Sequence, residues 1–272
     1  KKEKISVYNE TTKQGFIRHI IIRNSEKTKE VMVIIVTNGE KFDKKDRVID
    51  EITTRNPEIK SIIQNVNMKV TNVILGEKDI LLYGKDRITD YIGKLKFEIS
   101  AHSFFQVNSK QTETLYNKAL EYAGLTGKET VFDLYCGTGT ISLFLAQKAK
   151  KVYGVEIVKQ AVEDAKINAQ NNNIGNAEFI YGKSEEIVPQ LYKQGIKADV
   201  VVVDPPRSGC DGKLIDMLNK MQPEKIVYVS CNSATLARDI SLFEGYNVEK
   251  VQPVDMFPWT YHVECCLLLC HE

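Results

Sequence analysis

The spacing of apolar positions changes at about residue 108 of the chain. Before that point, three short runs rich in β-branched residues predict strands, and a helix is expected near residues 46–66, between the second run and the third. The runs are "GFIRHIIIRNS", "EVMVIIVTNG" and "NMKVTNVILG". Residues 1–100 are therefore predicted to form a small α+β unit.

From there on, helical and strand patterns alternate strictly, and "ADVVVVDPP" and "KIVYVSC" are almost continuously apolar. This is typical of a parallel sheet covered by helices on both faces. The segments "YNVEKVQPVDM" and "HVECCLLLC", joined by "FPWTY", predict an antiparallel hairpin that closes one edge. The predicted fold class is α/β, with a Rossmann-like, mostly parallel sheet over residues 101–272.

Composition narrows the class of protein. The 272 residues are 43% hydrophobic, which is enough for at least one full core. No apolar run approaches the roughly 18 residues of a membrane span, so we expect a cytoplasmic protein. All six cysteines lie at or after position 136 without a CxxC pair, which argues against a disulfide framework or a zinc ribbon.

Charge is distributed unevenly along the chain. Residues 1–100 carry 20 Lys and Arg against 15 Asp and Glu, whereas residues 101–272 carry 17 against 21. The basic excess of the first third suggests a surface that faces phosphates, although an ordinary solvated surface explains it nearly as well.

The segment "VFDLYCGTGTISLFLA" places Gly137 and Gly139 between a strand and a helix. Glycine allows positive φ and close approach to the backbone, and the helix N-terminus offers free N–H groups, so a nucleotide-type cofactor fits. Glu156 ends the next strand, about twenty residues on, where a carboxylate accepts both hydroxyls of a ribose. A dinucleotide fingerprint would place a third glycine where Ser142 stands, which disfavours NAD and a dehydrogenase.

Two more chemical groups follow strands. "VVVDPPRSG" sets Asp204 beside two prolines, which stiffen the segment and leave carbonyls free to accept hydrogen bonds. A charge at the end of a buried strand needs a partner. Cys231 follows the next strand. Most free cysteines are small buried hydrophobes, but the helix predicted in "SATLARDISLF" would lower the pKa of this thiol. Together with Gly137 and Glu156, these groups are expected to form one site at one edge of the sheet.

With Asp133 before the loop, "DLYCGTGTIS" resembles motif I of class I S-adenosylmethionine-dependent methyltransferases. The motifs "HSFFQVN", "DLYCGTGTIS", "VVVDPPR", "YVSCN" and "FPWTYHVE" occur in the order seen in the RNA uracil-C5 methyltransferases. That family makes 5-methyluridine in tRNA and 23S rRNA. The resemblance covers about residues 98–269, and more loosely the residues before them.

The resemblance implies a reaction and the residues that carry it out. Cys231 would be the nucleophile that adds to C6 of uracil, and Glu264 the general base that removes the C5 proton after methyl transfer. S-adenosylmethionine would be contacted by Gln106, Tyr135, Glu156 and Asp204. The expected RNA is 23S rRNA, ahead of tRNA, and we expect a monomer with no metal and no membrane partner.

Several assignments stay open at this stage. His262, expected on the same face of the strand as Glu264, is a rival base, a proton relay or a structural residue. Phe104 is expected to face the uracil, with Phe105 as the alternative. An RNA cytosine-C5 methyltransferase also uses a cysteine at C6, and a non-catalytic RNA-binding or cofactor-sensing protein on the same fold is the rival of another class.

The chain also departs from the usual pattern of the family. Ser233 stands where proline is usual and is expected to cap the helix, and Trp259 lies where members vary and is expected to tune substrate fit. The RNA-binding β-barrel of many members and the four-cysteine iron–sulfur cluster of some are not expected in this chain, which starts without methionine and has no cysteine before Cys136. The sequence is therefore expected to be part of a longer protein.

Overall fold

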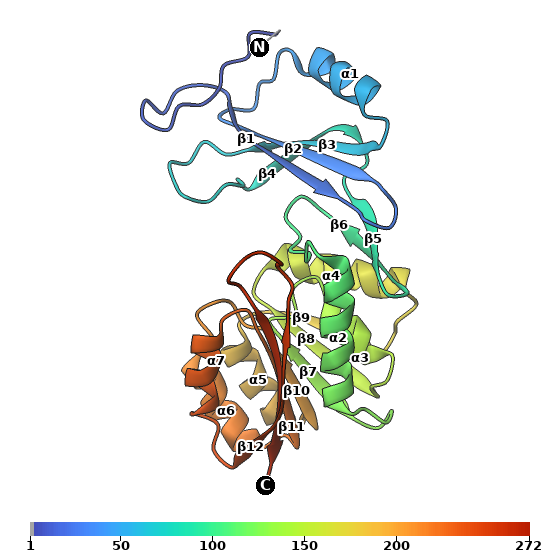
Figure 1. Cartoon of the computed structure of the whole chain (residues 1–272), viewed down its shortest axis with the longest axis vertical. Coiled ribbons are helices and arrows are strands. Elements are labelled where there is room, and N and C mark those ends of the chain that lie inside the picture. Colours follow the sequence, from blue (N-terminus) through green and yellow to red (C-terminus); the bar gives the residue numbers. More distant parts are fainter. Residues whose placement is uncertain (1–2) are drawn as a thin grey trace. The chain divides into compact units, whose positions relative to one another are not determined.

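The computed structural model describes residues 3–272, which divide into two units (Figure 1). The first comprises the chain up to Tyr91 together with Glu98–His102, and the second comprises Ile92–Phe97 and Ser103–Glu272. The sequence predicted a single boundary at residue 100, close to the end of the first unit at His102. The difference is the segment Ile92–Phe97, which groups with the second unit.

The first unit is built on a four-stranded sheet with the order β1-β2-β3-β4. Strands β2 and β3 are parallel, and the other two pairs are antiparallel. Buried side chains of β2, β3 and the single helix form its core. A separate two-stranded sheet joins the two units in sequence. The elements are β1 (Ile17–Asn24), β2 (Val31–Thr37), α1 (Lys45–Arg55), β3 (Ile59–Val66), β4 (Lys78–Gly84), β5 (Ile88–Ile92) and β6 (Leu95–Ile99).

Two expectations for the first unit are wrong. The helix ends at Arg55, because Pro57 disfavours helical backbone in the residue before it, and residues 59–66 form a buried strand instead. The strand expected in residues 67–76 is a loop. Asn67 closes that loop, since its side-chain amide donates to the carbonyls of Val73 and Ile74 at 2.8 and 2.9 Å.

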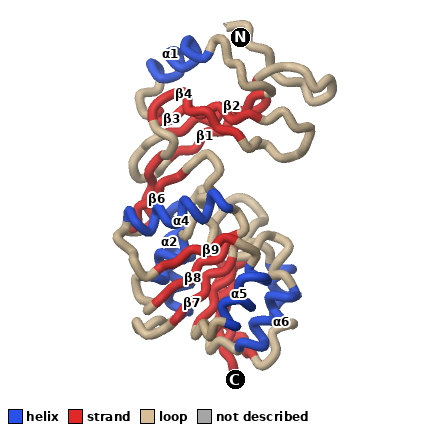
Figure 2. Tube along the Cα trace, turned by 180° about the vertical axis from the view of Figure 1, so that it is seen from behind, coloured by secondary structure: helices blue, strands red, loops and turns tan. Residues whose placement is uncertain are grey.

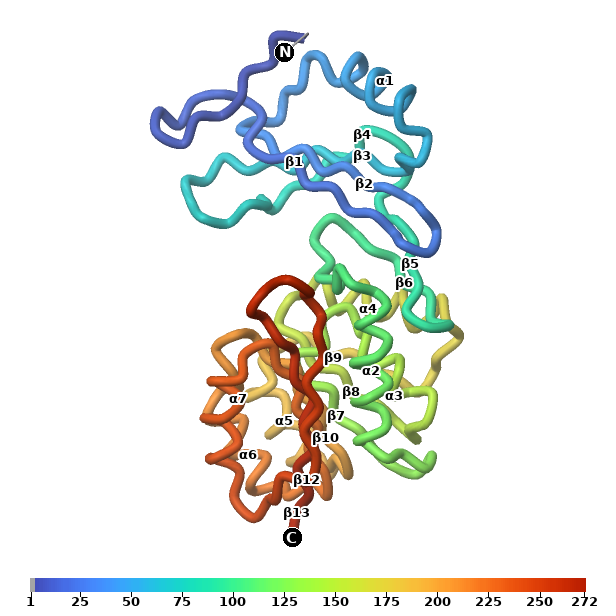
Figure 3. The backbone as a smooth tube through the Cα atoms, viewed as in Figure 1, coloured from blue at the N-terminus to red at the C-terminus, as the bar shows by residue number. Residues whose placement is uncertain are grey.

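The second unit contains a seven-stranded sheet with the order β12-β13-β11-β10-β7-β8-β9. Strands β7 to β11 run parallel, while β13 is antiparallel to both β11 and β12. Figure 3 shows β12 and β13 side by side in red. The predicted mostly parallel sheet with an antiparallel C-terminal hairpin is confirmed. The strands are β7 (Thr130–Leu134), β8 (Lys151–Glu156), β9 (Ala177–Tyr181), β10 (Val200–Val203), β11 (Lys225–Ser230), β12 (Tyr246–Val254) and β13 (Glu264–His271).

Helices cover both faces of this sheet. Alternate strand residues point to opposite faces, so Val200 and Val202 join one core and Val201 and Val203 the other. Helices α2 to α4 pack on the first face and α5 to α7 on the second. Figure 1 shows α2 in front of the sheet, and Figure 2, seen from behind, shows α5 and α6. The helices are α2 (Ser109–Ala123), α3 (Thr140–Ala146), α4 (Lys159–Asn171), α5 (Ser184–Lys193), α6 (Gly212–Met221) and α7 (Ser233–Ile240).

The strand order reverses between β7 and β10. From β7 the chain builds outward through β8 and β9, and then returns to place β10 on the other side of β7. In open α/β sheets, such a reversal leaves a crevice at the carboxyl ends of the strands, where ligands bind. None of the helices in residues 3–272 is long and apolar enough to cross a membrane.

Candidate active site

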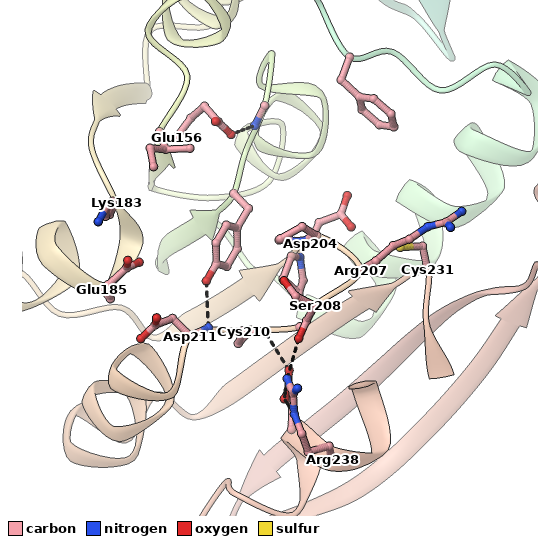
Figure 4. A pocket seen from close by; sticks show the side chains of 18 of the residues that line it. Glu156, Lys183, Glu185, Asp204, Arg207, Ser208, Cys210, Asp211, Cys231 and Arg238 are labelled. Carbon is pink, nitrogen blue, oxygen red and sulfur yellow. Dashed lines mark hydrogen bonds and ion pairs between the residues drawn. The ribbon is translucent and has the colours of Figure 1, made fainter. Parts of the chain in front are cut away.

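A pocket of about 1110 Å³ lies at the carboxyl ends of the parallel strands (Figure 4). Its walls come from the loops after β7, β10 and β11, the end of β8 and the start of β13. Because β13 is antiparallel, its first residue lies at the same edge as the last residues of the parallel strands. All seven predicted site residues line this pocket: Phe104, Gln106, Tyr135, Glu156, Asp204, Cys231 and Glu264.

The loop after β7 has two glycines with different tasks. Gly139, with φ of 79°, packs so tightly that an added Cβ would lie 2.9 Å from the Phe179 ring. Gly137, with φ of 54°, faces open space, since no atom lies within 4 Å of a Cβ built there. Glu156 holds this loop, accepting hydrogen bonds from the Gly137 N–H at 3.0 Å and the Val158 N–H at 2.8 Å. The bare backbone at Gly137 is therefore presented to the pocket.

Tyr135, at the start of the same loop, is a non-glycine residue with a left-handed backbone, at φ of 65°. Such conformations cost free energy and persist where the surroundings impose them, often at functional sites. Its hydroxyl accepts a hydrogen bond from the Asp211 N–H at 3.4 Å, which joins the loop after β7 to the segment after β10 (Figure 4).

Ser142, the residue that disfavoured a dinucleotide, has a structural partner beneath the loop. Its hydroxyl donates to the carboxyl group of Asp133, and both residues are fully buried. Burial raises the pKa of Asp133 to about 7. The serine therefore bonds one oxygen of a buried acid, where a dinucleotide-binding loop would have a third glycine, and the Asp133 Oδ1 has no hydrogen-bond partner among the described residues.

Asp204 follows β10 and faces the pocket (Figure 4). Burial raises its pKa well above the ordinary value, and the carboxyl groups of Glu264 and Asp133 raise it further. A partner was expected for the charge of the Asp204 carboxylate. Within residues 3–272, no positively charged group lowers the pKa of Asp204. Asp204 is thus a polar group directed at the pocket and free to bind a ligand.

Cys231 follows β11 and is half-buried in the pocket wall. Burial raises its pKa, Glu264 and Asp204 raise it further, and Arg207 acts in the opposite direction. The expectation that a helix N-terminus lowers this pKa is wrong. Asn232, and not Ser233, caps α7, because its side chain accepts the Ala234 N–H at 3.0 Å. One of the free N–H groups at that helix terminus therefore already has a partner.

Glu264 is the first residue of β13 and only 4% exposed. Burial raises the pKa of its carboxyl group, and the charge of Arg207 opposes that shift. The direction of this shift is the one expected for a general base. Arg207 lies beside Cys231 in Figure 4 and influences both the thiol and the acid.

The rival residues lie elsewhere. His262 is outside β13, in the loop before it, and is not among the residues that line the pocket. It therefore does not share a strand face with Glu264. Phe105 packs into the core, with its ring centroid 5.8 Å from that of Phe97, whereas Phe104 is 71% exposed and lines the pocket.

Some residues that shape the site had no clear signal in the sequence. Buried Asp239 on α7 accepts hydrogen bonds from the Tyr228 hydroxyl at 2.6 Å and the Cys210 N–H at 2.7 Å. Arg238 donates to the Ser208 carbonyl at 2.8 Å. Helix α7 thereby fixes the loop that begins at Asp204, but the partners lie about thirty positions apart in sequence, and no local pattern relates them.

The electrostatics of the thiol lead to a testable expectation. Because the Glu264 carboxylate raises the pKa of Cys231, Glu264→Gln is expected to lower that pKa and to speed alkylation of Cys231 by iodoacetamide several-fold at pH 7.5. Peptide mass spectrometry measures the rate at Cys231, with Cys210 as the buried internal reference. Equal rates in the two proteins across pH 6–9 would show that the carboxylate does not act on the thiol.

Comparison with known proteins places this chain in a family. Residues 43–272 match the family model described as tRNA (Uracil-5-)-methyltransferase. The chain belongs to this family. Within residues 3–272 there is no group of three or more His, Cys, Asp or Glu side chains that could hold a metal ion, and all six cysteines are free.

Proteins described as RNA methyltransferases resemble this chain over almost all of its length. It is 57% identical to an uncharacterized RNA methyltransferase of Clostridium tetani and 56% identical to one of Bacillus cereus, each over 270 residues. These alignments cover 98% of this chain and 59% of each relative. The chain thus spans about three fifths of the length of the curated relatives it matches.

A solved structure confirms the fold class. The tRNA (uracil-54, C5)-methyltransferase of Pyrococcus abyssi, crystallised with S-adenosyl-L-homocysteine, has a TM-score of 0.83 to this chain at 35% sequence identity. The match covers 98% of this chain and 63% of that one. The predicted methyltransferase fold therefore matches the fold of this solved methyltransferase.

Proposed function

We propose that this chain transfers a methyl group from S-adenosylmethionine to C5 of a uridine in RNA, through a covalent bond between Cys231 and C6 of the base. The observation that carries the proposal is the meeting of Cys231, Glu264 and the glycine loop in one pocket. Family membership supports it, as does the bound S-adenosyl-L-homocysteine of the Pyrococcus abyssi relative.

The pocket suits this cofactor. Glu156 stands at the end of β8, where a carboxylate accepts ribose hydroxyls, and Gly137 leaves its backbone open to a ligand. Asp204 offers a polar group without a counter-ion among the described residues, and Gln106 and Tyr135 complete the proposed set of contacts. When bound, the sulfonium of the cofactor supplies the methyl group.

The protein side chains then account for the rest of the reaction. Uracil C5 is too weak a nucleophile to accept a methyl group directly, so the Cys231 sulfur adds to C6 and the electron pair of the C5–C6 double bond moves toward C5 and O4. Bound S-adenosylmethionine would supply the methyl group to this C5, and the electron pair of its S–CH₃ bond would remain on the cofactor sulfur. Glu264 removes the C5 proton, the double bond re-forms, and the bond between sulfur and C6 breaks to return the thiolate.

Arg207 is placed to assist the first of these steps. Its charge lowers the pKa of Cys231 against the combined effect of burial and two carboxyl groups. A protein that keeps its nucleophile mostly protonated until the substrate arrives avoids side reactions of a thiolate. Activity is accordingly expected to need deprotonation of the thiol in the assembled complex.

The proposed RNA is 23S rRNA, and tRNA is the comparison. The test uses transcripts of both that carry tritium at C5 of uridine, incubated with S-adenosylmethionine. Each methyl group added is expected to release one tritium to water, because the C5 hydrogen must leave. Methyl incorporation without tritium release would indicate cytosine as the target, and RNA binding without either signal would indicate a non-catalytic binding protein.

A further inference from the structure

An aromatic series runs outward from the pocket along the loop between β12 and β13. Phe257 lines the pocket, and its ring centroid lies 6.4 Å from that of His262. The His262 ring centroid lies 4.2 Å from that of Tyr261, a side chain that is 89% exposed. Trp259, on the same loop, is fully exposed. Aromatic surface therefore begins at the pocket wall and continues into solvent.

Trp259 has no role in the core. Its side chain buries no surface, so it adds nothing to the hydrophobic stabilisation of the unit. Its backbone is left-handed, at φ of 70°, which is a genuine outlier for a bulky residue. Both features are costs to the folded chain. An outlier of this kind, in an exposed loop that also supplies pocket residues, points to a ligand.

The conformation of the loop is fixed by its own hydrogen bonds. The N–H and the hydroxyl of Thr260 both donate to the Phe257 carbonyl, at 3.2 and 2.8 Å, and the Thr260 hydroxyl accepts the His262 N–H at 3.2 Å. Asn108 donates to the Met256 carbonyl at 3.2 Å and ties the loop to the segment of Phe104. The outward position of Trp259 is thus held in place and is not a loose end.

We infer that Trp259 and Tyr261 form a stacking surface for the unpaired nucleobases that adjoin the target uridine. This rests on the proposed function, since it needs a uridine in the pocket. A base that enters a pocket leaves its neighbours without a stacking partner, and exposed aromatic rings replace that partner for any base, because every base has a π face.

The position of the loop favours nucleobases as the occupant. The target uridine stays joined to its neighbours, so the adjoining nucleotides must lie close to the rim that holds Cys231, Phe257 and Glu264. Within the loop of residues 255–263, Phe257 lines the pocket, whereas Trp259 and Tyr261 are exposed and do not line it. The substrate class that fits is therefore single-stranded RNA, or an unpaired loop of a folded RNA.

Trp259 is the only tryptophan of the 272 residues, so its fluorescence reports on this surface alone. The probes are a single-stranded RNA of about nine nucleotides with one central uridine and the same strand annealed to its complement. The Cys231→Ala protein is used so that no covalent bond forms. We expect the single strand to quench Trp259, and the duplex to do so only at much higher concentration. Unchanged fluorescence with the single strand overturns the inference.

Kinetics with matched variants separate the ring from the loop. Trp259→Asn removes the ring and keeps a residue that tolerates the left-handed backbone, whereas Trp259→Phe keeps a ring. KM for the RNA is expected to rise roughly 10-fold or more in Trp259→Asn, with a smaller change in kcat, and to be largely restored in Trp259→Phe. Equal KM values in Trp259→Asn and the wild type overturn the inference.

The two proposals fail in distinguishable ways. If the wild type releases no tritium but Trp259 is quenched by the single strand, the methyl-transfer proposal is wrong and the stacking surface stands. If tritium is released, while KM is unchanged in Trp259→Asn and the single strand does not quench Trp259 in the Cys231→Ala protein, the stacking surface is wrong and the reaction stands.

Discussion

Replacing Cys231 with alanine is expected to reduce methyl transfer by at least about 10³-fold. Within residues 3–272, the only other thiol that lines the pocket is that of Cys210, whose pKa burial raises to about 12. Binding of S-adenosylmethionine should persist, since its proposed contacts are untouched. The measurement is methyl incorporation into RNA under single-turnover conditions, with cofactor binding followed by calorimetry.

The matched control is Cys270→Ala. Cys270 is also a partly exposed free cysteine, but it lies at the far end of β13 and does not line the pocket. That variant is expected to keep activity close to that of the wild type. Retention of more than a tenth of the activity by Cys231→Ala would mean that the reaction proceeds without this nucleophile.

Glu264→Gln is expected to accumulate a covalent protein–RNA complex. Addition and methyl transfer can proceed, but the C5 proton has no acceptor, so the bond between Cys231 and C6 is not released. Turnover should slow by about 10²- to 10⁴-fold. A denaturing gel detects the complex as a band of retarded mobility, and labelled cofactor shows that the trapped base carries a methyl group.

Two further variants decide the assignment of the base. Cys231→Ala combined with Glu264→Gln should show no retarded band, because the bond requires the sulfur. His262→Gln should turn over without accumulating a complex, since His262 does not line the pocket. A retarded band in His262→Gln, together with normal turnover in Glu264→Gln, would show that His262 and not Glu264 is the general base.

The site could be predicted largely from sequence for a physical reason. Parallel strands bring their carboxyl ends to one edge, so residues that end apolar runs meet there whatever their separation along the chain. Glu156, Asp204 and Cys231 follow that rule. Glu264 begins a strand and still reaches the same edge, because β13 is antiparallel to β11.

What escaped prediction depends on partners that no local pattern reveals. The pKa of Cys231 rises because the thiol is buried and because Glu264 and Asp204 converge on it from two other strands, and the net direction is upward although a helix follows. In the first unit, apolar content at residues 67–76 suggested a strand. The exposed side chains of Met68, Val70 and Val73 show that those residues are not part of a buried face.

The insertion of β13 between β11 and β12 has a consequence for how the site is assembled. Strand β12 precedes β13 in sequence, yet β13 is the only strand of the sheet with which it pairs among the described residues. On a ribosome, β12 would emerge as an unpaired segment, and β11 would remain an open edge until residues 264–271 followed. Cys231 is therefore synthesised before Glu264, its proposed partner in catalysis. Closing the sheet and completing the proposed catalytic pair then happen together, when residues 264–271 are added.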